Sequence, residues 1–219
     1  MRYASAMRFA VGRQLLTSFL SALAIVASTA PRAHADVITV ATWVFQLLDD
    51  TTPPVNQGQR QLSFAARTIY DPPAHQFTLP AVDSAGDPTP QGASGGGASL
   101  TFYNANGSGE STTVTLPAVG WHREGPLNGA RYVYGASPLE PIYKIWVKNN
   151  KITIRGGRGS WGFSLDEPSQ GRLALRLTLG TGDTWCAETV PRAPTLLYDR
   201  PDRFLGQPHT PAPVVCPAP

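Results

Sequence analysis

A glycine-rich stretch at residues 92–96, GASGG, has the G-x-S-x-G spacing in which serine hydrolases place their nucleophile. In those enzymes the serine lies exposed on a strained turn between a strand and a helix. Here further glycines follow Ser94, and a run typical of a strand comes next. The match is therefore one of composition, and we expect no catalytic residue at this position.

Acid–base chemistry would need a histidine or a carboxylate within hydrogen-bond reach of the substrate. In WHREG, residues 121–125, His122 and Glu124 are two positions apart and would share one face of a strand. Glu140 is a second carboxylate that could pair with this histidine. A lone exposed histidine is the simpler interpretation, so the sequence favours a protein that is not an enzyme and makes a hydrolase the less favoured class.

The sequence contains no recognisable spacing of metal ligands. The histidines after residue 35 are His75, His122 and His209, and none is at ligand spacing from another histidine or a cysteine. Acids that occur close together lie in predicted turns or in the C-terminal tail, where they are ordinary turn formers. These are Asp49–Asp50, Asp166–Glu167, and Asp199 with Asp202. A loop calcium site would be the alternative, but the EF-hand pattern is absent, and we expect neither a metal nor a cofactor.

A group of cations surrounds one aromatic side chain in residues 143–155, YKIWVKNNKITIR. If this segment is a β-hairpin, one face carries Lys144, Trp146, Lys148, Lys151 and Arg155. Such a face could attract an anionic polysaccharide or lipid head groups. It could also be a solvated sheet face whose lysines protect an edge strand from pairing. A third interpretation is a carbohydrate-binding module that uses Trp146 and neighbouring aromatics as a stacking platform.

The hairpin itself is predicted from its turn and its alternation. Asn149–Asn150 would form a two-residue loop, since Asn tolerates the positive φ that a type I′ turn needs. This loop pairs Lys148 with Lys151 and places five apolar residues on the opposite face. They are Tyr143, Ile145, Val147, Ile152 and Ile154. A one-residue slip would mix the two faces, so the pattern supports this register.

Strand signals recur at intervals of roughly ten residues through the rest of the chain, with no clear helical periodicity. In residues 172–179, RLALRLTL, leucines alternate with residues that point the other way, including Arg172 and Arg176. Further strands are expected at residues 37–48, 60–69, 75–80, 98–104, 111–117 and 130–135, with others starting at 161 and 183. The sequence predicts an all-β fold, an antiparallel β-sandwich of about 9–11 short strands with long Gly/Pro-rich loops.

The first 35 residues are interpreted as a signal peptide. A basic region with Arg2, Arg8 and Arg13 precedes an apolar run at residues 15–27, and AHA then predicts cleavage between Ala35 and Asp36. The signal survives whether translation starts at Met1 or Met7. Four of the 18 basic residues and none of the 15 acidic ones precede Asp36, which leaves 14 against 15 and a net charge of −1. A global charge signature for nucleic acid is therefore absent, and we expect no nucleic-acid partner.

Residues 36–219 are predicted to form one domain. Residues 83–99 are a Gly/Ser/Pro-rich loop or linker, and residues 191–219 are a tail with eight prolines that cannot form a central strand. The chain has two cysteines, Cys186 and Cys216, which an exported protein most simply joins as a disulfide. A free or metal-bound pair is the alternative.

Several motifs of the C-terminal half resemble a known family. They are the segment FSLDEPSQGRLALRLTLGTGDTWCAE (residues 163–188), the upstream GDPTPQGAS and TFYN, and the closing PAPVVCP. Together they are similar to an uncharacterised domain family in exported proteins of myxobacteria and their relatives, over residues 62–217. The resemblance implies an exported β-domain without an assigned activity. Relatives often carry a second cysteine pair flanking the hairpin, which this chain lacks.

The sequence thus predicts an exported, non-catalytic β-sandwich protein in the periplasm or outside the cell. Its expected role is that of a binding or structural module of the cell envelope or exterior, which could contact anionic surfaces and does not span a membrane after processing.

Overall fold

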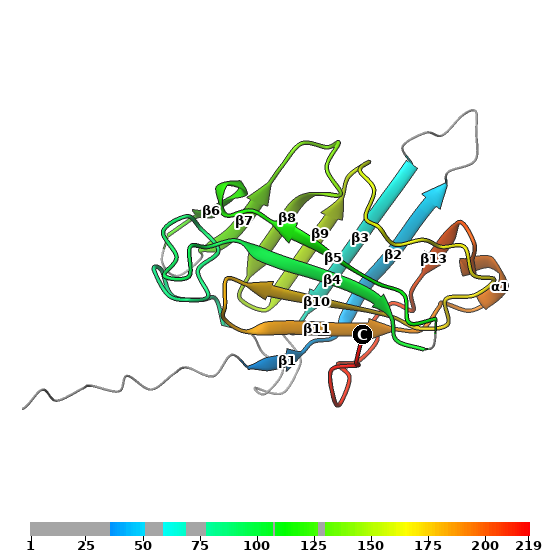
Figure 1. Ribbon diagram of the computed structural model, residues 1–219. Helices are drawn as coiled ribbons and strands as arrows, with labels where there is room; N and C mark the ends of the chain where they lie inside the picture. The colour runs from blue at the N-terminus through cyan, green and yellow to red at the C-terminus, as the bar shows by residue number, and fades with distance from the viewer. Residues whose placement is uncertain (1–35, 51–58, 69–77, 107, 127–129) are drawn as a thin grey trace, which may run out of the picture. The chain divides into compact units, whose positions relative to one another are not determined.

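The computed structural model describes residues 36–50, 59–68, 78–106, 108–126 and 130–219, and these form two β-sheets that pack face to face (Figure 1). The described residues contain 13 strands and two short helical turns, η2 (Ala118–Gly120) and α1 (Thr195–Tyr198). The all-β sandwich predicted from the sequence is therefore confirmed. The predicted signal peptide lies outside the described residues, as does most of the strand predicted at 75–80; its remaining residues, 78–80, are not in a strand.

The smaller sheet has five strands in the order β1-β11-β10-β4-β5. They are β1 (Val37–Thr39), β11 (Thr184–Thr189), β10 (Leu173–Leu179), β4 (Ala98–Asn104) and β5 (Ser111–Leu116). The pairing of β1 with β11 is parallel and the other three pairings are antiparallel.

The larger sheet has eight strands in the order β12-β13-β2-β3-β9-β8-β7-β6, all paired antiparallel. They are β12 (Asp199–Arg200), β13 (Arg203–Leu205), β2 (Thr42–Asp50), β3 (Gln59–Arg67), β9 (Lys151–Gly156), β8 (Ile142–Lys148), β7 (Arg131–Gly135) and β6 (Trp121–Glu124). The β8–β9 hairpin is therefore an interior part of this sheet, and the tail contributes its strands at one edge.

The β8–β9 hairpin has the register expected from the sequence. Lys148 pairs with Lys151, and the pairing continues to Lys144 opposite Arg155. Asn150 has a φ of 65°, but Asn149 is not among the described residues with positive φ, so the two-residue loop is not the type I′ turn expected from the sequence. The prediction for Tyr143 was wrong: the register shifts between Ile142 and Lys144, so Ile142 takes the buried position and Tyr143 is only partly buried.

Two other sequence predictions are corrected by the structure. The strand expected at residues 37–48 is two strands, because the chain leaves the five-stranded sheet after β1 and enters the eight-stranded sheet at β2. Val40 and Ala41, between them, are both buried. The strand expected to start at Trp161 does not form; Trp161 and Phe163 nevertheless pack edge-on against Phe102 in the core.

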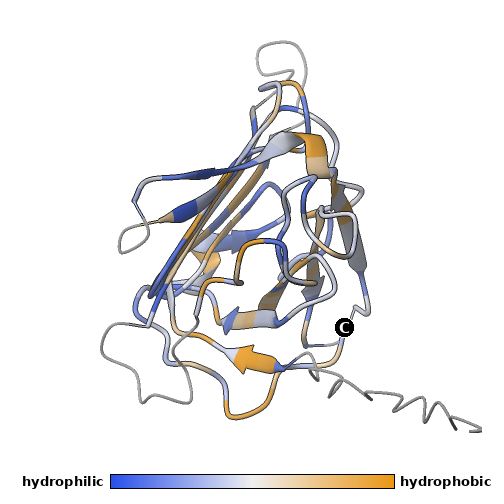
Figure 2. Cartoon of the chain, turned by 90° about the vertical axis from the view of Figure 1, so that its left-hand side faces the viewer, coloured by the Kyte–Doolittle hydropathy of each residue, from blue (hydrophilic) through white to orange (hydrophobic). Residues whose placement is uncertain are grey.

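The core fills the space between the two sheets. Apolar residues of both sheets belong to one buried cluster, and hydrophobic and hydrophilic stretches are mixed along the strands (Figure 2). Leu100 and Leu177 of the five-stranded sheet belong to the same buried cluster as Phe45, Phe64 and Ile154 of the eight-stranded sheet. Phe45 meets Phe64 edge-on, with the ring centroids 5.6 Å apart.

The Gly/Ser/Pro-rich loop at residues 83–99 is ordered by a buried carboxylate, that of Asp87. One oxygen accepts hydrogen bonds from the backbone N–H and the hydroxyl of Thr89, and the other accepts one from the N–H of Asp83. The loop is tied to the β10–β11 turn by the N–H of Thr181, which donates to the carbonyl of Ala85. This segment is therefore a packed cap rather than a linker.

Candidate functional site

Four cations lie side by side across the outer face of the eight-stranded sheet. In the strand register, Arg131 on β7 is opposite Lys148 on β8, Lys148 is opposite Lys151 on β9, and Lys151 is opposite Arg67 on β3. Each side chain is at least partly exposed. We call Arg131, Lys148, Lys151 and Arg67 the basic row. Like charges directly opposite each other on neighbouring strands destabilise a sheet, so this arrangement costs stability in the free protein.

An aromatic side chain lies beside the basic row. Trp146 is the next outward-facing residue of β8 and is paired with Val133 on one side and Thr153 on the other. Its ring is partly exposed, and the ammonium of Lys144 lies 5.2 Å from the ring centroid, within cation–π range. Arg155, opposite Lys144, donates a hydrogen bond to the hydroxyl of Ser63.

A shallow pocket lies over the basic row and the tryptophan. Its volume is ≈ 260 Å³, and it is lined by Arg131, Trp146, Lys148, Lys151 and Thr153. These residues come from three neighbouring strands, so the pocket crosses the strands rather than following one. All five cationic and aromatic residues predicted for this face lie on it together, and three of them line the pocket.

The positive charge of this face is only partly balanced. Glu124 on β6 accepts a hydrogen bond of 2.7 Å from Arg131. Within the described ranges, no acidic side chain forms an ion pair with Lys144, Lys148 or Lys151. The hydrogen bond from His122, followed by that from Arg131, holds the pKa of the Glu124 carboxyl below its ordinary value. The three lysines therefore present charge to solvent or to a ligand.

The position of the lysines argues against one of the alternatives raised by the sequence. The edges of the sheet are β6 and β12, whereas β8 and β9 have neighbours on both sides. Lysines on interior strands do not protect an edge from pairing. Moreover, Lys144, Lys148 and Lys151 are the only lysines in the sequence.

Two cations of this face were missed by sequence reasoning. Arg67 ends β3, which is far from the hairpin in the sequence, and Arg131 begins β7, the strand directly before the hairpin. Their outward direction follows from alternation along their own strands. Only the order of the strands in the sheet places them beside Lys151 and Lys148.

His122 and Glu124 are within hydrogen-bond distance, as their spacing suggested. Nε2 of His122 lies 2.9 Å from Oε1 of Glu124, on the edge strand β6. Their side chains are 55% and 38% exposed, and the second oxygen of Glu124 is bound by Arg131. Glu140, the other candidate partner, lines a separate pocket between the ends of β5 and β8. His122 and Glu124 are thus part of an exposed hydrogen-bonded network with Arg131 at one end of the basic row.

Ser94 is not presented as a nucleophile. Its hydroxyl donates a 2.9 Å hydrogen bond to the carbonyl of Ala85. The three glycines that follow have positive φ and lead directly into β4 rather than into a helix. The turn between strand and helix that a hydrolase needs is therefore not formed at this serine.

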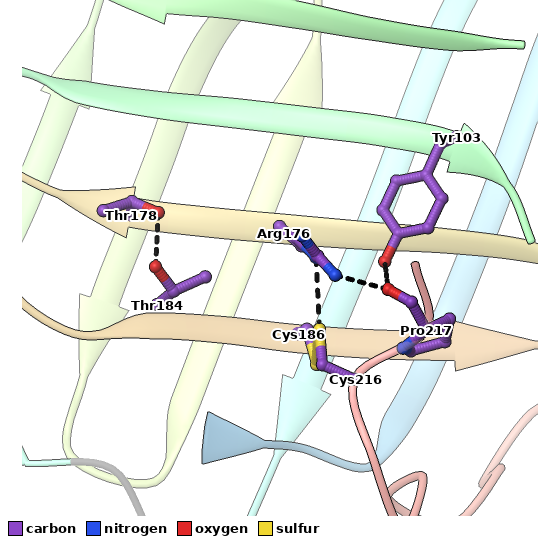
Figure 3. The surroundings of a disulfide bond; sticks show 7 residues. All are labelled: Tyr103, Arg176, Thr178, Thr184, Cys186, Cys216 and Pro217. Atoms are coloured by element: carbon purple, nitrogen blue, oxygen red, sulfur yellow. Dashed lines mark hydrogen bonds between the residues drawn. A yellow bond between two sulfur atoms is a disulfide. The ribbon is translucent and has the colours of Figure 1, made fainter. Parts of the chain in front are cut away.

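The two cysteines form a disulfide that holds the tail against the five-stranded sheet (Figure 3). Cys186 lies on β11, and the bond closes a segment of 30 residues. Arg176 donates a hydrogen bond from Nε to Sγ of Cys216, and its guanidinium also bonds the carbonyl of Pro217. That carbonyl accepts a further bond, of 2.7 Å, from the hydroxyl of Tyr103.

Arg172 and Arg176 therefore do not extend the basic face. Arg172 directly precedes β10 and Arg176 lies on β10, so both belong to the five-stranded sheet. The tail covers Arg176 there. Arg172 forms an ion pair with Glu188 at 3.5 Å. The outward direction predicted for Arg176 is consistent with these contacts, but the two arginines serve the other sheet.

Three carboxylates approach one another at the turn DEPSQG. Glu110, Asp166 and Glu167 offer oxygens within 4.8 Å, close enough to hold a metal ion. They already accept hydrogen bonds, since the backbone N–H of Ser164 donates to Glu110, its hydroxyl donates to Asp166, and the side-chain amide of Gln170 donates to Glu167. The buried Asp199 accepts a hydrogen bond from the backbone N–H of Gln170 in the same turn. From the sequence, Asp199 was expected only to be one of the acids of the C-terminal tail.

No helix in the described part of the chain is both long and apolar enough to cross a bilayer. Comparison with protein families, with characterised proteins and with solved structures finds no match to this chain, so the family resemblance noted from its motifs stays a prediction.

Proposed function

We propose that the protein is an exported, non-catalytic binding module of the cell envelope or exterior, and that it binds an anionic polysaccharide on the outer face of its eight-stranded sheet. The basic row carries this proposal. Four cations are placed directly opposite one another on neighbouring strands, an arrangement that is unfavourable in the free protein and becomes favourable when anions lie between them.

The surroundings of Trp146 favour a sugar polymer over lipid head groups. Proteins that bind membranes through their surface insert protruding apolar side chains beside the basic ones. Here the aromatic ring is partly buried in the sheet and lines a shallow pocket with the cations. In this pocket the flat ring of Trp146 can stack on the face of a sugar, and the cations can bind the carboxylate or sulfate groups of that sugar.

A module for neutral carbohydrates, built on several stacked aromatics, has less support. Trp121, Trp161 and Trp185 are buried in the core. Trp43 is partly exposed, but its ring is covered by Arg67 at 4.4 Å and contacts His209 at 4.4 Å. Among the described tryptophans, this leaves Trp146 for a ligand, so charge has to supply most of the affinity.

The disulfide supports the proposed location. Disulfides form and persist in oxidising compartments outside the cytosol. The bond between Cys186 and Cys216 therefore agrees with export, which the N-terminal sequence predicts.

A matched pair of double variants tests the proposal. Lys148→Ser/Lys151→Ser removes two charges from the basic row, and Arg158→Ser/Arg192→Ser removes two from other exposed positions. Each exposed charge contact is worth up to about 1 kcal/mol, so the first variant should bind polygalacturonate about tenfold more weakly. The second should bind like the wild type, and added salt should weaken all of the binding.

Retention on neutral dextran that equals retention on polygalacturonate would favour the neutral-carbohydrate alternative. Equal loss in both double variants, or binding that salt does not change, would show that the basic row is not the site. Thermal unfolding of each variant verifies that it is folded.

A further inference from the structure

We infer that the ligand is a linear polyuronate, with one carboxylate on each sugar, that lies across strands β7, β8, β9 and β3 with one sugar unit on each strand. The inference rests on the proposed function and goes further, since it gives the chemistry, direction and length of the bound segment.

The spacing of the cations sets the spacing of the charges they can bind. Neighbouring strands are about 4.8 Å apart, whereas successive residues on one face of a strand are about 7 Å apart. The basic row therefore repeats one positive charge at roughly 5 Å intervals across the sheet. A polymer of uronic acids carries one carboxylate on every sugar, so its charges repeat at a comparable interval.

The direction follows from where the cations are consecutive. Along β8, Lys148 and Lys144 are separated by Trp146, and along β9, Lys151 and Arg155 are separated by Thr153. Across the strands, by contrast, the basic row has no interruption. A continuous polyanion meets an unbroken series of cations only when it crosses the strands.

Trp146 and the pocket provide for the sugar rings. The pocket lies between the basic row and the row that contains Trp146 and Thr153. Carboxylates on one side of the chain can then face the cations while the ring of a sugar rests on the tryptophan. Such a ligand has charged groups along one edge and the apolar face of a sugar beside them. The pocket matches it, with cations on one side and Trp146 on the other.

Both ends of the basic row have features that limit the bound length to four units. At one end, Glu124 holds Arg131 and would repel a fifth carboxylate over β6. At the other end, Arg67 lies over Trp43 on β2. Trp43 carries no charge and lies at the irregularity between Thr42 and Val44, and no residue of β2 is paired with Arg67, so the row of cations ends at β3.

The length of the ligand is the decisive measurement. Oligogalacturonates of two to six units are titrated into the full chain by calorimetry, and quenching of tryptophan fluorescence is followed in parallel. We expect each unit up to the fourth to raise affinity about two- to fivefold, because each adds one exposed charge contact. The fifth and sixth units should add less than twofold, and carboxyl-reduced oligomers of equal length should bind at least tenfold more weakly.

Two variants locate the end of the site. Arg67→Ser should move the plateau from four units to three, while Arg155→Ser, which changes a cation outside the basic row, should leave the plateau at four. Thermal unfolding identifies any variant that fails to fold, and the wild-type length series stands without them.

The possible failures are distinguishable. An affinity that stops rising at two units while long polygalacturonate still binds would overturn the inference and leave the proposed function standing. Binding to phosphatidylglycerol vesicles but to no oligogalacturonate would overturn the inference and the choice of a polysaccharide. Failure to bind polygalacturonate, dextran sulfate and anionic vesicles alike would overturn both.

Discussion

Lys151 faces a cation on each neighbouring strand, Lys148 on β8 and Arg67 on β3. A sheet evolved for stability alone would place an acid or a neutral residue at this position, since opposite charges on facing strands are favourable and like charges are not. A lysine at position 151 therefore lowers the stability of the sheet but favours the proposed binding of an anion.

Lys151→Glu should stabilise the free protein and impair binding. The new carboxylate would face two cations, so we expect the free energy of unfolding to rise by about 0.5–1 kcal/mol. Affinity for polygalacturonate should fall further than in Lys151→Ser. Urea unfolding and calorimetry measure the two effects, and because their signs are opposite, loss of binding cannot be ascribed to unfolding. A decrease in both would contradict this interpretation of the row.

Asp199 has the opposite role, as a buried acid that holds a turn. It is 4% exposed and accepts hydrogen bonds from the hydroxyl of Ser169 at 2.5 Å, the N–H of Gln170 at 2.6 Å and the N–H of Gly171 at 2.9 Å. The rigidity of the DEPSQG turn thus depends on a residue about thirty positions later, which local sequence patterns do not reveal.

Asp199→Ala should lower the free energy of unfolding by about 2–4 kcal/mol, because it leaves buried donors without an acceptor. Asp199→Asn, which keeps one acceptor oxygen, should cost less. Asp202→Ala is the control: this exposed acid is paired with Arg200, and its loss should change stability by about 0.5 kcal/mol or less. Equal effects of Asp199→Ala and Asp202→Ala, measured by urea unfolding, would refute the assigned role.

At the scale of elements, the tail is attached to the sandwich in two ways. β13 pairs with β2 at the edge of the larger sheet, and the disulfide anchors residue 216 on β11 of the smaller sheet. The proline-rich composition correctly excluded a central strand, yet it gave no indication that part of the tail would extend an edge.

Cys186→Ala/Cys216→Ala should lower the free energy of unfolding by about 3–4 kcal/mol, from the chain entropy of a closed segment of 30 residues. A reductant should lower the melting temperature of the wild type toward that of the variant and should not affect the variant itself. If a reductant left the melting temperature of the wild type unchanged even after the protein had been unfolded in its presence, the disulfide would be refuted. Two free thiols in the denatured, unreduced protein would refute it as well.

The hairpin shows which parts of this fold local patterns can predict. A two-residue turn and strict alternation determined the register of β8 and β9, because any slip would have buried lysines. The passage from β1 to β2 was not predictable in this way. An apolar run has the same sequence pattern whether its residues pair in one sheet or pass from one sheet to the other. The register shift at Tyr143 likewise depends on neighbours outside the hairpin.

The candidate site was predictable to the same extent. Lys144, Trp146, Lys148, Lys151 and Arg155 share one hairpin, so alternation placed them on one face. Arg67 and Arg131 join them through the order of strands in the sheet, which pairs β3 with β9 and β7 with β8. Arg176, which alternation also directed outward, belongs to the other sheet and is covered by the tail.

At the scale of the whole molecule, buried tyrosines on both sheets link stability to alkaline pH. Burial raises the pKa of Tyr132 to about 12, and the nearby Asp87 carboxylate adds to this effect. Burial also raises the pKa of Tyr103 on β4 and of Tyr134 on β7. The neutral phenol is therefore favoured in the folded protein, which binds more protons than the unfolded chain between the two pKa values.

The contribution of these tyrosines to the free energy of unfolding should accordingly be fully present below pH 10, the ordinary tyrosine pKa, and be lost as the pH rises from 10 to about 12. Urea unfolding at a series of pH values, together with phenolate absorbance, measures both sides of this linkage. Tyr132→Phe should show a shallower fall over the same range. Phenolate formation by every tyrosine near pH 10 in the folded state would contradict the assignment.

The confinement of all three lysines to β8 and β9 has a practical consequence for anyone searching for the ligand. Apart from the N-terminal amine, amine-reactive chemistry can attach this protein to a bead, a sensor surface or a dye only through the proposed binding face. A screen performed on protein coupled in that way would occlude its own target and return nothing. Capture through a terminal tag leaves the face open, and the contrast between the two coupling chemistries is itself a quick measure of whether the lysines matter.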